Sequence, residues 1–317
     1  MITGTSSGIG LAAAVGAARS GWTVVATMRD TGKADALREA VTEAGVAGRV
    51  RVERLDVTDS ESIAACLDEV TAECGRLDAL VNNAGAAQVG TIEQSSLDDV
   101  RAAMKVNFFG VVAVTRAALP HLRASRGRVI TVSSVGGAVG QPFNEAYCAA
   151  KFAAEGFMQS LAPVAATVGV DVTVVEPGAV ASEFVTNLGL DVPAMLAGAG
   201  PYAPALQAYI TRTQKSFGSA QTPAQAAAPI VEALTADRPP FRIQTSQWVR
   251  DFVATTLADL DGSAVRDLTA AWVATPRLSR CTGAGWWSRG RDESPPGPGG
   301  CDPVVGVTPP CRPRSRC

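Results

Sequence analysis

The alternation of short apolar runs with longer alanine-rich stretches constrains the fold of this chain most. Five runs are short, apolar and rich in β-branched residues, at 22–27, 50–55, 79–81, 129–132 and 170–175. Between them lie stretches with helical spacing, at 8–20, 31–44, 59–74, 97–124 and 146–168. Strands that are apolar on both faces and separated by helices form a parallel sheet covered on both sides. The sequence therefore predicts an α/β fold, a doubly wound parallel sheet with helices on both faces.

Both ends of the chain depart from this rhythm. Only Met1 and Ile2 precede the first turn, so we expect a first strand that lacks several residues. Beyond residue 276 the chain is rich in Gly, Pro, Arg and Cys, a composition that buries no core. We predict one domain over residues 1–276 and a disordered tail over 277–317.

The composition narrows the class of protein. An apolar fraction of 47% and a charged fraction of 18% are typical of a globular chain with a substantial core. A net charge of −2 argues against a nucleic-acid partner, which usually needs a basic face. No apolar run approaches the ~20 residues that span a bilayer, and the N-terminus lacks a signal-peptide pattern. We expect no membrane span and a cytoplasmic protein.

The cysteines and the one histidine argue against metal chemistry in this chain. Cys66, Cys74 and Cys148 lie in helical stretches, where we expect reduced, buried thiols. The four tail cysteines follow no zinc spacing and have no histidine beside them, so we predict no metal site. His121 follows Pro120 near an expected helix end, which suits a capping or surface role and argues against a catalytic histidine.

Tyr147 and Lys151 are the first candidates for chemistry. Residues four apart share one face of a helix, so the ammonium can lie beside the phenol. A free tyrosine has a pKa near ~10. At roughly 4 Å and an effective dielectric of about 20, the cation favours the phenolate by ~4 kcal/mol, or about three pKa units. We therefore predict a Tyr147 phenol near the operating pH, where general acid–base catalysis works best.

The opening segment 3–10 carries glycines at positions 4, 8 and 10. Between a strand and a helix, such a turn lets the backbone approach a pyrophosphate at the helix N-terminus. The glycine spacing differs from Gly-x-Gly-x-x-Gly, and an ordinary flexible turn is the alternative. Its place at the start of an alternating α/β chain favours phosphate binding.

The ends of the second and third expected strands bear on the nucleotide. Met28 and Arg29 stand where an acidic residue would hold a ribose 2′-hydroxyl, and a cation there accommodates a 2′-phosphate. This pattern favours NADP(H) over NAD(H), unless Arg29 is a solvated charge paired with Asp30. Asp56 could bond an adenine amino group or cap the helix that follows, and the two roles are compatible.

Two groups of amides add to the candidate site. Asn82-Asn83-Ala84-Gly85 follows the fourth expected strand and could brace the backbone around a nucleotide or form a plain turn. Asn107 lies within a helical stretch, where Asn is disfavoured. It is either a helix-surface amide or a side chain that holds a water or bonds a kinked backbone.

Taken in order, these motifs resemble the short-chain dehydrogenase/reductase family. The set is Thr3-Gly-x-x-x-Gly-Ile-Gly10, Asn82-Asn-Ala-Gly85, Asn107, Ser134, Tyr147-x-x-x-Lys151 and Pro177-Gly178. The resemblance runs from residue 2 to about 275 and implies a single Rossmann domain. Residues 134–137 and 142–156 further resemble the 17β-hydroxysteroid dehydrogenase and retinol dehydrogenase branch.

The resemblance implies a role for each site residue. Tyr147 exchanges the proton, Lys151 lowers the phenol pKa and binds the nicotinamide ribose, Ser134 bonds the substrate oxygen, and Asn107 holds a relay water. The cofactor would be held by residues of the glycine turn, the strand ends and the loop after 170–175: Thr3, Gly4, Ser6, Ser7, Gly8, Ile9, Gly10, Arg29, Asp56, Val57, Asn83, Ala84, Gly85, Tyr147, Lys151, Pro177, Gly178, Val180 and Ser182.

The leading hypothesis is an NADP(H)-dependent oxidoreductase that interconverts a secondary alcohol and a ketone or aldehyde. Residues 183–220 favour an apolar substrate or equally a lid packed on the core, through Phe184, Leu188, Leu190, Met195, Leu196, Tyr202 and Phe217. A ketoacyl thioester reductase is a second interpretation, and its carrier protein would dock on Arg116, Arg123, Arg126 and Arg128. A third is a regulator that binds NADP(H) without turnover.

Two further expectations concern assembly and stability. The resemblance implies a homodimer or homotetramer formed through the helices near 97–124 and 146–168. Pro163 falls within the helix that carries Tyr147 and Lys151, where a proline kinks a helix or costs ~3 kcal/mol. Thr222, followed by Pro223, predicts the start of another helix.

Overall fold

The computed structural model describes residues 1–182, 191–258 and 263–273. Its sheet has seven parallel strands in the order β3-β2-β1-β4-β5-β6-β7. The strands are β1 (Ile2–Thr3), β2 (Val24–Met28), β3 (Val50–Arg54), β4 (Ala79–Asn82), β5 (Arg128–Val132), β6 (Asp171–Glu176) and β7 (Arg242–Gln244). The order reverses at β1, and the carboxyl ends of β1 and β4 meet there, as in doubly wound nucleotide-binding folds.

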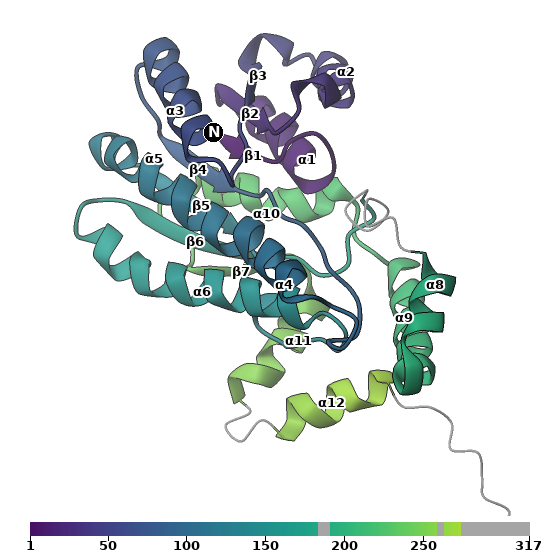
Figure 1. Cartoon of the computed structure of the whole chain (residues 1–317). Helices are drawn as coiled ribbons and strands as arrows, with labels where there is room; N and C mark the ends of the chain where they lie inside the picture. The colour runs from purple at the N-terminus through teal and green to yellow at the C-terminus, as the bar shows by residue number, and fades with distance from the viewer. Residues whose placement is uncertain (183–190, 259–262, 274–317) are drawn as a thin grey trace, which may run out of the picture. The chain divides into compact units, whose positions relative to one another are not determined.

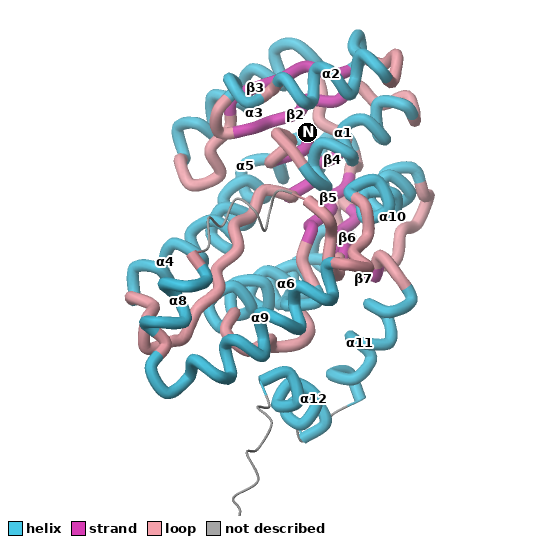
Figure 2. The backbone as a smooth tube through the Cα atoms, turned by 90° about the vertical axis from the view of Figure 1, so that its right-hand side faces the viewer, coloured by secondary structure: helices cyan, strands magenta, loops and turns pink. Residues whose placement is uncertain are grey.

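Helices cover both faces of this sheet (Figures 1 and 2). On one face pack α1 (Gly8–Arg19), α2 (Asp35–Glu43) and α10 (Pro223–Thr235). On the other pack α3 (Ser60–Cys74), α5 (Val111–Ser125) and α6 (Glu145–Ala166). The remaining elements are α4 (Leu97–Met104), a π-helical turn η3 (Lys105–Gly110), α8 (Val192–Gly198), α9 (Ala203–Phe217), α11 (Gln247–Ala258), α12 (Ser263–Val273) and the short 3₁₀ turns η1 (Thr31–Lys33), η2 (Ala47–Arg49), η4 (Val135–Gly137) and η5 (Gly200–Tyr202). The doubly wound parallel sheet predicted from the sequence is confirmed.

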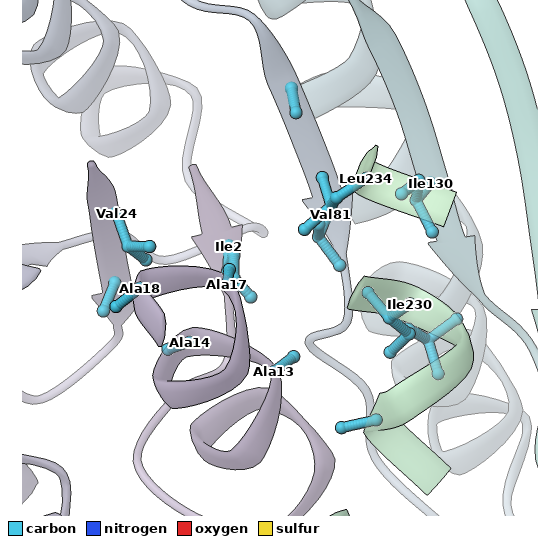
Figure 3. Packing of buried hydrophobic residues seen from close by; sticks show 14 of the residues in the cluster. Ile2, Ala13, Ala14, Ala17, Ala18, Val24, Val81, Ile130, Ile230 and Leu234 are labelled. Atoms are coloured by element: carbon cyan, nitrogen blue, oxygen red, sulfur yellow. The ribbon is translucent and has the colours of Figure 1, made fainter. Parts of the chain in front are cut away.

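Small side chains bring α1 close to the sheet. Four alanines of α1 are fully buried and face the strands: Ala13, Ala14, Ala17 and Ala18 (Figure 3). Alanine places no atom beyond Cβ, so the helix axis lies near Ile2 and Val24. Beside it, α10 fills the same layer with the larger Ile230 and Leu234. A short strand thereby becomes part of a continuous core.

The two-residue β1 is held on both sides. Ile2 pairs with Ala26 of β2 and Val81 of β4. The Met1 ammonium donates a hydrogen bond of 2.8 Å to the Ala79 carbonyl, and burial lowers the pKa of this amino group to about 6. A small hollow remains where a longer strand would lie, lined by Met1, Ile2, Ala17, Trp22, Thr23, Val24, Ala79, Val81 and Leu234.

Three local features differ from the sequence expectations or extend them. β7 was not predicted, because Arg-Ile-Gln carries no apolar run. α6 continues past Pro163 to Ala166, so the proline does not end the helix, and Pro163 lies exposed in its last turns. The kink or stability cost expected at this residue stays a prediction. The predicted helix start at Thr222 is confirmed, since its side chain accepts a hydrogen bond from Gln225 in a capping box.

Three further expectations concern the cysteines, the predicted tail and a membrane span. Cys66 and Cys148 are buried free thiols, and Cys74 is a half-buried one. The predicted tail at 277–317 lies outside the described residues, and the contacts between residues gather within Met1–Pro276. One described helix, Leu97–Ser125, is long and apolar enough to cross a membrane by length and composition, which is weak evidence. Its Val114, Ala118 and Leu122 are buried against the sheet, as in the core helix of a globular domain.

Lengthening β1 by two valines before Met1 should stabilise the fold. The added residues would lie beside Val24 and Ala79 and fill the hollow, and burying a valine contributes about 1.5–3 kcal/mol. The amine would also leave its buried position. In the present chain its folded pKa of about 6 lies below the usual value of 8.0 for a free amino terminus, so the unfolded state binds protons more tightly and this group costs stability as pH falls from 8 to 6.

Chemical unfolding at pH 6 and at pH 8 measures both effects. The valine extension should raise the free energy of unfolding more at pH 6 than at pH 8. An extension by two glycines, which fills no space, is the matched control. Equal gains from both extensions at both pH values would contradict the prediction.

Candidate active site

Helix α6 brings Tyr147 and Lys151 onto one face. The Lys151 ammonium lies 5.8 Å from the centre of the Tyr147 ring. Tyr147 is half-buried, and Lys151 is only 5% exposed. The Lys151 ammonium donates a hydrogen bond of 3.1 Å to the Val132 carbonyl at the end of β5. Both side chains are therefore fixed where the first turns of α6 pass the carboxyl end of β5.

Ser134 lies beside Tyr147. It follows β5, and its hydroxyl accepts a hydrogen bond of 3.0 Å from the Gly136 N–H. A hydrogen bond also joins the hydroxyls of Ser134 and Tyr147. A methyl group added at Gly136 would lie 3.3 Å from Tyr147 Cε1 and 3.5 Å from Ser134 Oγ. Gly136 thus lets the backbone run close under both groups.

The pKa values of the pair follow from burial. Burial raises the pKa of the Tyr147 phenol to about 12, although the hydrogen bond with Ser134 lowers it in part. Burial lowers the pKa of Lys151 to about 8, opposed by the negative charge of Glu155. The predicted near-neutral Tyr147 pKa is wrong for the protein alone. The ammonium bonds to a carbonyl, and its attraction for the phenolate does not offset the loss of water around the ring.

Asn107 occupies the π-helical turn η3 and is fully buried, so the helix-surface interpretation is wrong. Its amide donates to the carbonyls of Ala86 at 2.8 Å and Ala103 at 3.0 Å, and its oxygen accepts from the Ala86 N–H at 3.2 Å. It therefore bonds the distorted helix to the loop after β4. A methyl group at Gly85 would lie 2.9 Å from Asn107 Oδ1 and 3.6 Å from Lys151 Nζ, which places these groups together.

The glycine turn is tied to the end of β4. The Thr3 hydroxyl accepts hydrogen bonds of 3.0 Å from the N–H groups of Asn83 and Ala84. In return, the Asn83 side-chain amide donates to the carbonyls of Thr3 and Gly4, both at 2.9 Å. Gly4 has φ +71°, and a methyl group there would lie 2.8 Å from Ala84 Cα. The close approach of the two loops requires glycine at this position.

The residues around the start of α1 fit a pyrophosphate. Ser7 precedes the helix but makes no side-chain capping bond, so the N–H groups of the first turn remain open to an anion. Ser6, Ser7, Gly8 and Ile9 are all half-buried at this edge. A methyl group at Gly8 would lie 3.2 Å from Ser182 Cβ, so the loop after β6 borders the same space.

The residues at the ends of β2 and β3 bear on the interpretations of Arg29 and Asp56. Met28 is buried, and Arg29 is exposed at the end of β2. Asp30 bonds the Gly32 N–H at 2.9 Å, and the ion pairs among the described residues do not include one between Arg29 and Asp30. Asp56 is not the cap of α3: it accepts from the backbone and hydroxyl of Thr58, and Asp59 caps the helix.

The loop after β6 is anchored from two sides. The Pro177 carbonyl accepts from the Val135 N–H at 2.9 Å, which links this loop to the one that carries Ser134. Gly178 lies against Val249, and Val180 forms an isolated bridge with Gln221. Val57 lies at the base of the π-helical turn, where a methyl group at Gly110 would meet its side chain at 2.8 Å.

The helices α8 and α9 cover the outer side of the site. Met195, Leu196, Leu206 and Tyr209 pack with Val139 and Phe143 in a third apolar cluster. Tyr202 is exposed, Phe217 is half-buried, and Phe184, Leu188 and Leu190 lie outside the described residues. The lid interpretation of this segment therefore holds for Met195 and Leu196, which pack on the core.

Sequence reasoning missed several residues near the site. Asn144, three residues before Tyr147, donates a hydrogen bond of 2.6 Å to the Tyr209 hydroxyl of α9. The buried Glu155 and Glu176 form a cluster with the half-buried Arg242, and Glu155 lies one helical turn after Lys151. In the sequence, only the four-residue spacing from Lys151 to Glu155 could have pointed to this cluster. Glu176 and Arg242 lie far from Lys151 along the chain.

Substituting Gly10 by alanine should disrupt the glycine turn. The added methyl would lie 2.2 Å from the Gly4 carbonyl oxygen and 2.4 Å from Asn83 Nδ2, so the backbone must move. Overpacking of this kind costs about 1–3 kcal/mol. Thermal unfolding should show a lower midpoint, and nucleotide should no longer raise it. Gly48→Ala is the control, because nothing lies within 4 Å of its added methyl. An unchanged response to nucleotide in Gly10→Ala would refute the prediction.

Comparison with known proteins agrees with this architecture. The family model described as short chain dehydrogenase matches residues 1–192. Retinol dehydrogenase 8 of Homo sapiens is 40% identical over 273 residues, covering 83% of this chain and 85% of that protein. The 17-beta-hydroxysteroid dehydrogenase type 1 of Homo sapiens is 36% identical over 270 residues, with 83% and 82% covered. A short-chain dehydrogenase structure from Streptomyces avermitilis superposes with a TM-score of 0.66 at 34% identity, over 86% of this chain and 94% of that one. The chain belongs to the short-chain dehydrogenase family.

Proposed function

We propose that this protein is an NADP(H)-dependent oxidoreductase that interconverts a secondary alcohol and a ketone or aldehyde of apolar character. One observation carries the proposal: Ser134, Tyr147 and Lys151 converge beside a glycine turn whose open helix N-terminus fits a pyrophosphate. The two relatives described above are named for retinol and 17-beta-hydroxysteroids, both apolar alcohols, which supports this substrate class.

In this proposal Tyr147 transfers the proton. A phenol with a pKa of about 12 keeps its proton at neutral pH, and this form donates to a carbonyl oxygen during reduction. Ser134 bonds the same oxygen as negative charge develops on it. Lys151 supplies a positive charge that stabilises the phenolate left on Tyr147. The bound nicotinamide supplies or accepts the hydride, and the protein contributes orientation and electrostatics.

The preference for NADP(H) rests on the end of β2. Arg29 is exposed there, Asp30 is engaged with Gly32, and Met28 offers no carboxylate for a ribose 2′-hydroxyl. A guanidinium binds a phosphate through two parallel N–H groups, which makes it the residue that suits a 2′-phosphate.

The thioester reductase is less well supported. Of the four arginines proposed as a carrier-docking surface, Arg128 donates to the carbonyls of Ala233 and Ala236 at the end of α10. That guanidinium is occupied within the fold. Arg116, Arg123 and Arg126 remain exposed along α5, and they alone form a weaker basic surface.

Self-association belongs to the same proposal. Phe109 of η3 and Phe152 and Val164 of α6 are exposed apolar side chains. They lie on the two helical segments through which the resemblance implies pairing. Burying them against a second copy would remove their apolar surface from water.

Replacing Tyr147 by phenylalanine should lower the turnover rate strongly and preserve nucleotide binding. Loss of a positioned acid lowers the rate by about 10²–10⁴-fold. NADPH oxidation with steroid, retinoid and ketoacyl carbonyls measures turnover, and fluorescence titration measures NADPH affinity. Tyr202→Phe, at an exposed tyrosine bonded to Glu93, is the control. A parent protein that binds NADPH and reduces none of these carbonyls would favour the regulator.

Replacing Arg29 by glutamine should weaken NADPH binding and leave NADH binding unchanged. A hydrogen bond to a charged group contributes about 1.5–3 kcal/mol, which corresponds to roughly 10–150-fold in affinity. Isothermal titration with both nucleotides measures the difference. Lys33→Gln removes an exposed positive charge four residues away and is the matched control. Equal weakening by both substitutions would show that only the general electrostatic field matters.

A further inference from the structure

Two buried carboxyl groups form a pair, and one of them lies one helical turn after Lys151. Glu155, on α6, is 4% exposed, and Glu176, at the end of β6, is fully buried. Neither belongs to the set that we propose for proton and hydride transfer. Buried carboxylates are costly unless they are paired and hydrogen-bonded, so their position next to Lys151 requires an explanation.

The contacts of the pair are specific. The Ser133 hydroxyl donates to Glu155 Oε1 at 2.7 Å, and the Gln244 amide donates to Glu176 Oε2 at 2.7 Å. Arg242 Nε lies 3.2 Å from Glu155 Oε2 and 3.3 Å from Glu176 Oε1. Arg242 thus bridges the two carboxyl groups. Two carboxylates that share one guanidinium carry a surplus negative charge, which favours protonation of one of them.

The charges around the pair favour protonation of one carboxyl group. Within the described residues, Arg242 is the one cation that forms an ion pair with these two carboxyl groups. Burial, and then the negative charge of Glu155, raise the pKa of Glu176 to about 7. Of the two carboxyl groups, Glu176 is therefore the one for which burial favours the protonated form.

Glu155 acts on Lys151 in two ways. Its charge raises the Lys151 pKa, which burial has lowered to about 8. It also accepts a hydrogen bond from Ser133, the residue directly after Val132. The Val132 carbonyl in turn accepts a hydrogen bond from the Lys151 ammonium. The other groups around Lys151 are Tyr147 from α6 and Asn107 and Gly85 from the opposite side. None of these carries a negative charge at neutral pH.

We propose that Glu155 is a positioning residue that keeps Lys151 charged and correctly placed, and that Glu176 and Arg242 keep Glu155 ionised. The assignment rests on the proposed function for its consequence in catalysis, but it concerns the charge of Lys151 in the protein itself. Without the Glu155 charge, burial should leave Lys151 neutral near pH 7, and the phenolate on Tyr147 would lose its counter-charge.

The experiment measures Lys151 directly. The sequence has four lysines, Lys33, Lys105, Lys151 and Lys215, so ¹³Cε-lysine NMR gives four titration curves, and Lys151→Arg assigns the relevant one. In Glu155→Gln, we expect the Lys151 midpoint to fall by at least one pH unit. Glu155→Asp, which keeps the charge, should restore most of that shift. Glu43→Gln, at an exposed glutamate of α2, should leave the midpoint unchanged.

A second titration covers the case in which Glu155→Gln does not fold. Coupling between two sites is reciprocal, so removing the Lys151 charge must raise the titration midpoint of the carboxyl pair by a similar amount. Lys151→Met with ¹³Cδ-glutamate NMR measures this shift. Both readouts are independent of turnover, so a protein that reduces no carbonyl still tests the assignment. A Lys151 midpoint unchanged in folded Glu155→Gln, or a carboxyl midpoint unchanged in Lys151→Met, would overturn it.

Discussion

The exchange of hydrogen bonds between Thr3 and Asn83 is the interaction on which the rest of the site depends. These side-chain hydrogen bonds fasten the two-residue β1 to the end of β4, because so short a strand forms few backbone hydrogen bonds of its own. The same bonds fix the angle at which the chain enters α1. The start of α1 and the loop after β4 are therefore joined, and that loop is bonded in turn to Asn107.

Desolvation governs the chemistry of the site. Tyr147, Lys151 and Glu176 all have pKa values displaced toward their neutral forms, and burial is the largest cause in each case. In such a site, burial favours the neutral form of each group unless a group of opposite charge lies close to it. The arrangement of charges around Lys151 thus matters more than the simple proximity of Lys151 to the phenol.

The sequence predicted the parts of this fold that periodicity controls. Apolar runs located five of the strands, β2 to β6, to within two residues at each end, and the i to i+4 spacing placed Tyr147 and Lys151 on one face. Features set by tertiary contacts escaped it. β7 consists of Arg-Ile-Gln and forms because β6 offers an open edge, and Glu155 meets Glu176 and Arg242 only after the sheet has closed. The Tyr147 pKa was misjudged because burial leaves no mark on a local motif.

The bond from Asn144 to Tyr209 bears on which substitutions the outer helices tolerate. It joins α9 to the residue that precedes α6, three positions before Tyr147. Substitutions in α8 and α9 that spare Tyr209 leave this hydrogen bond in place. The outer surface of these two helices can therefore change without loss of the bond to the start of the helix that carries Tyr147.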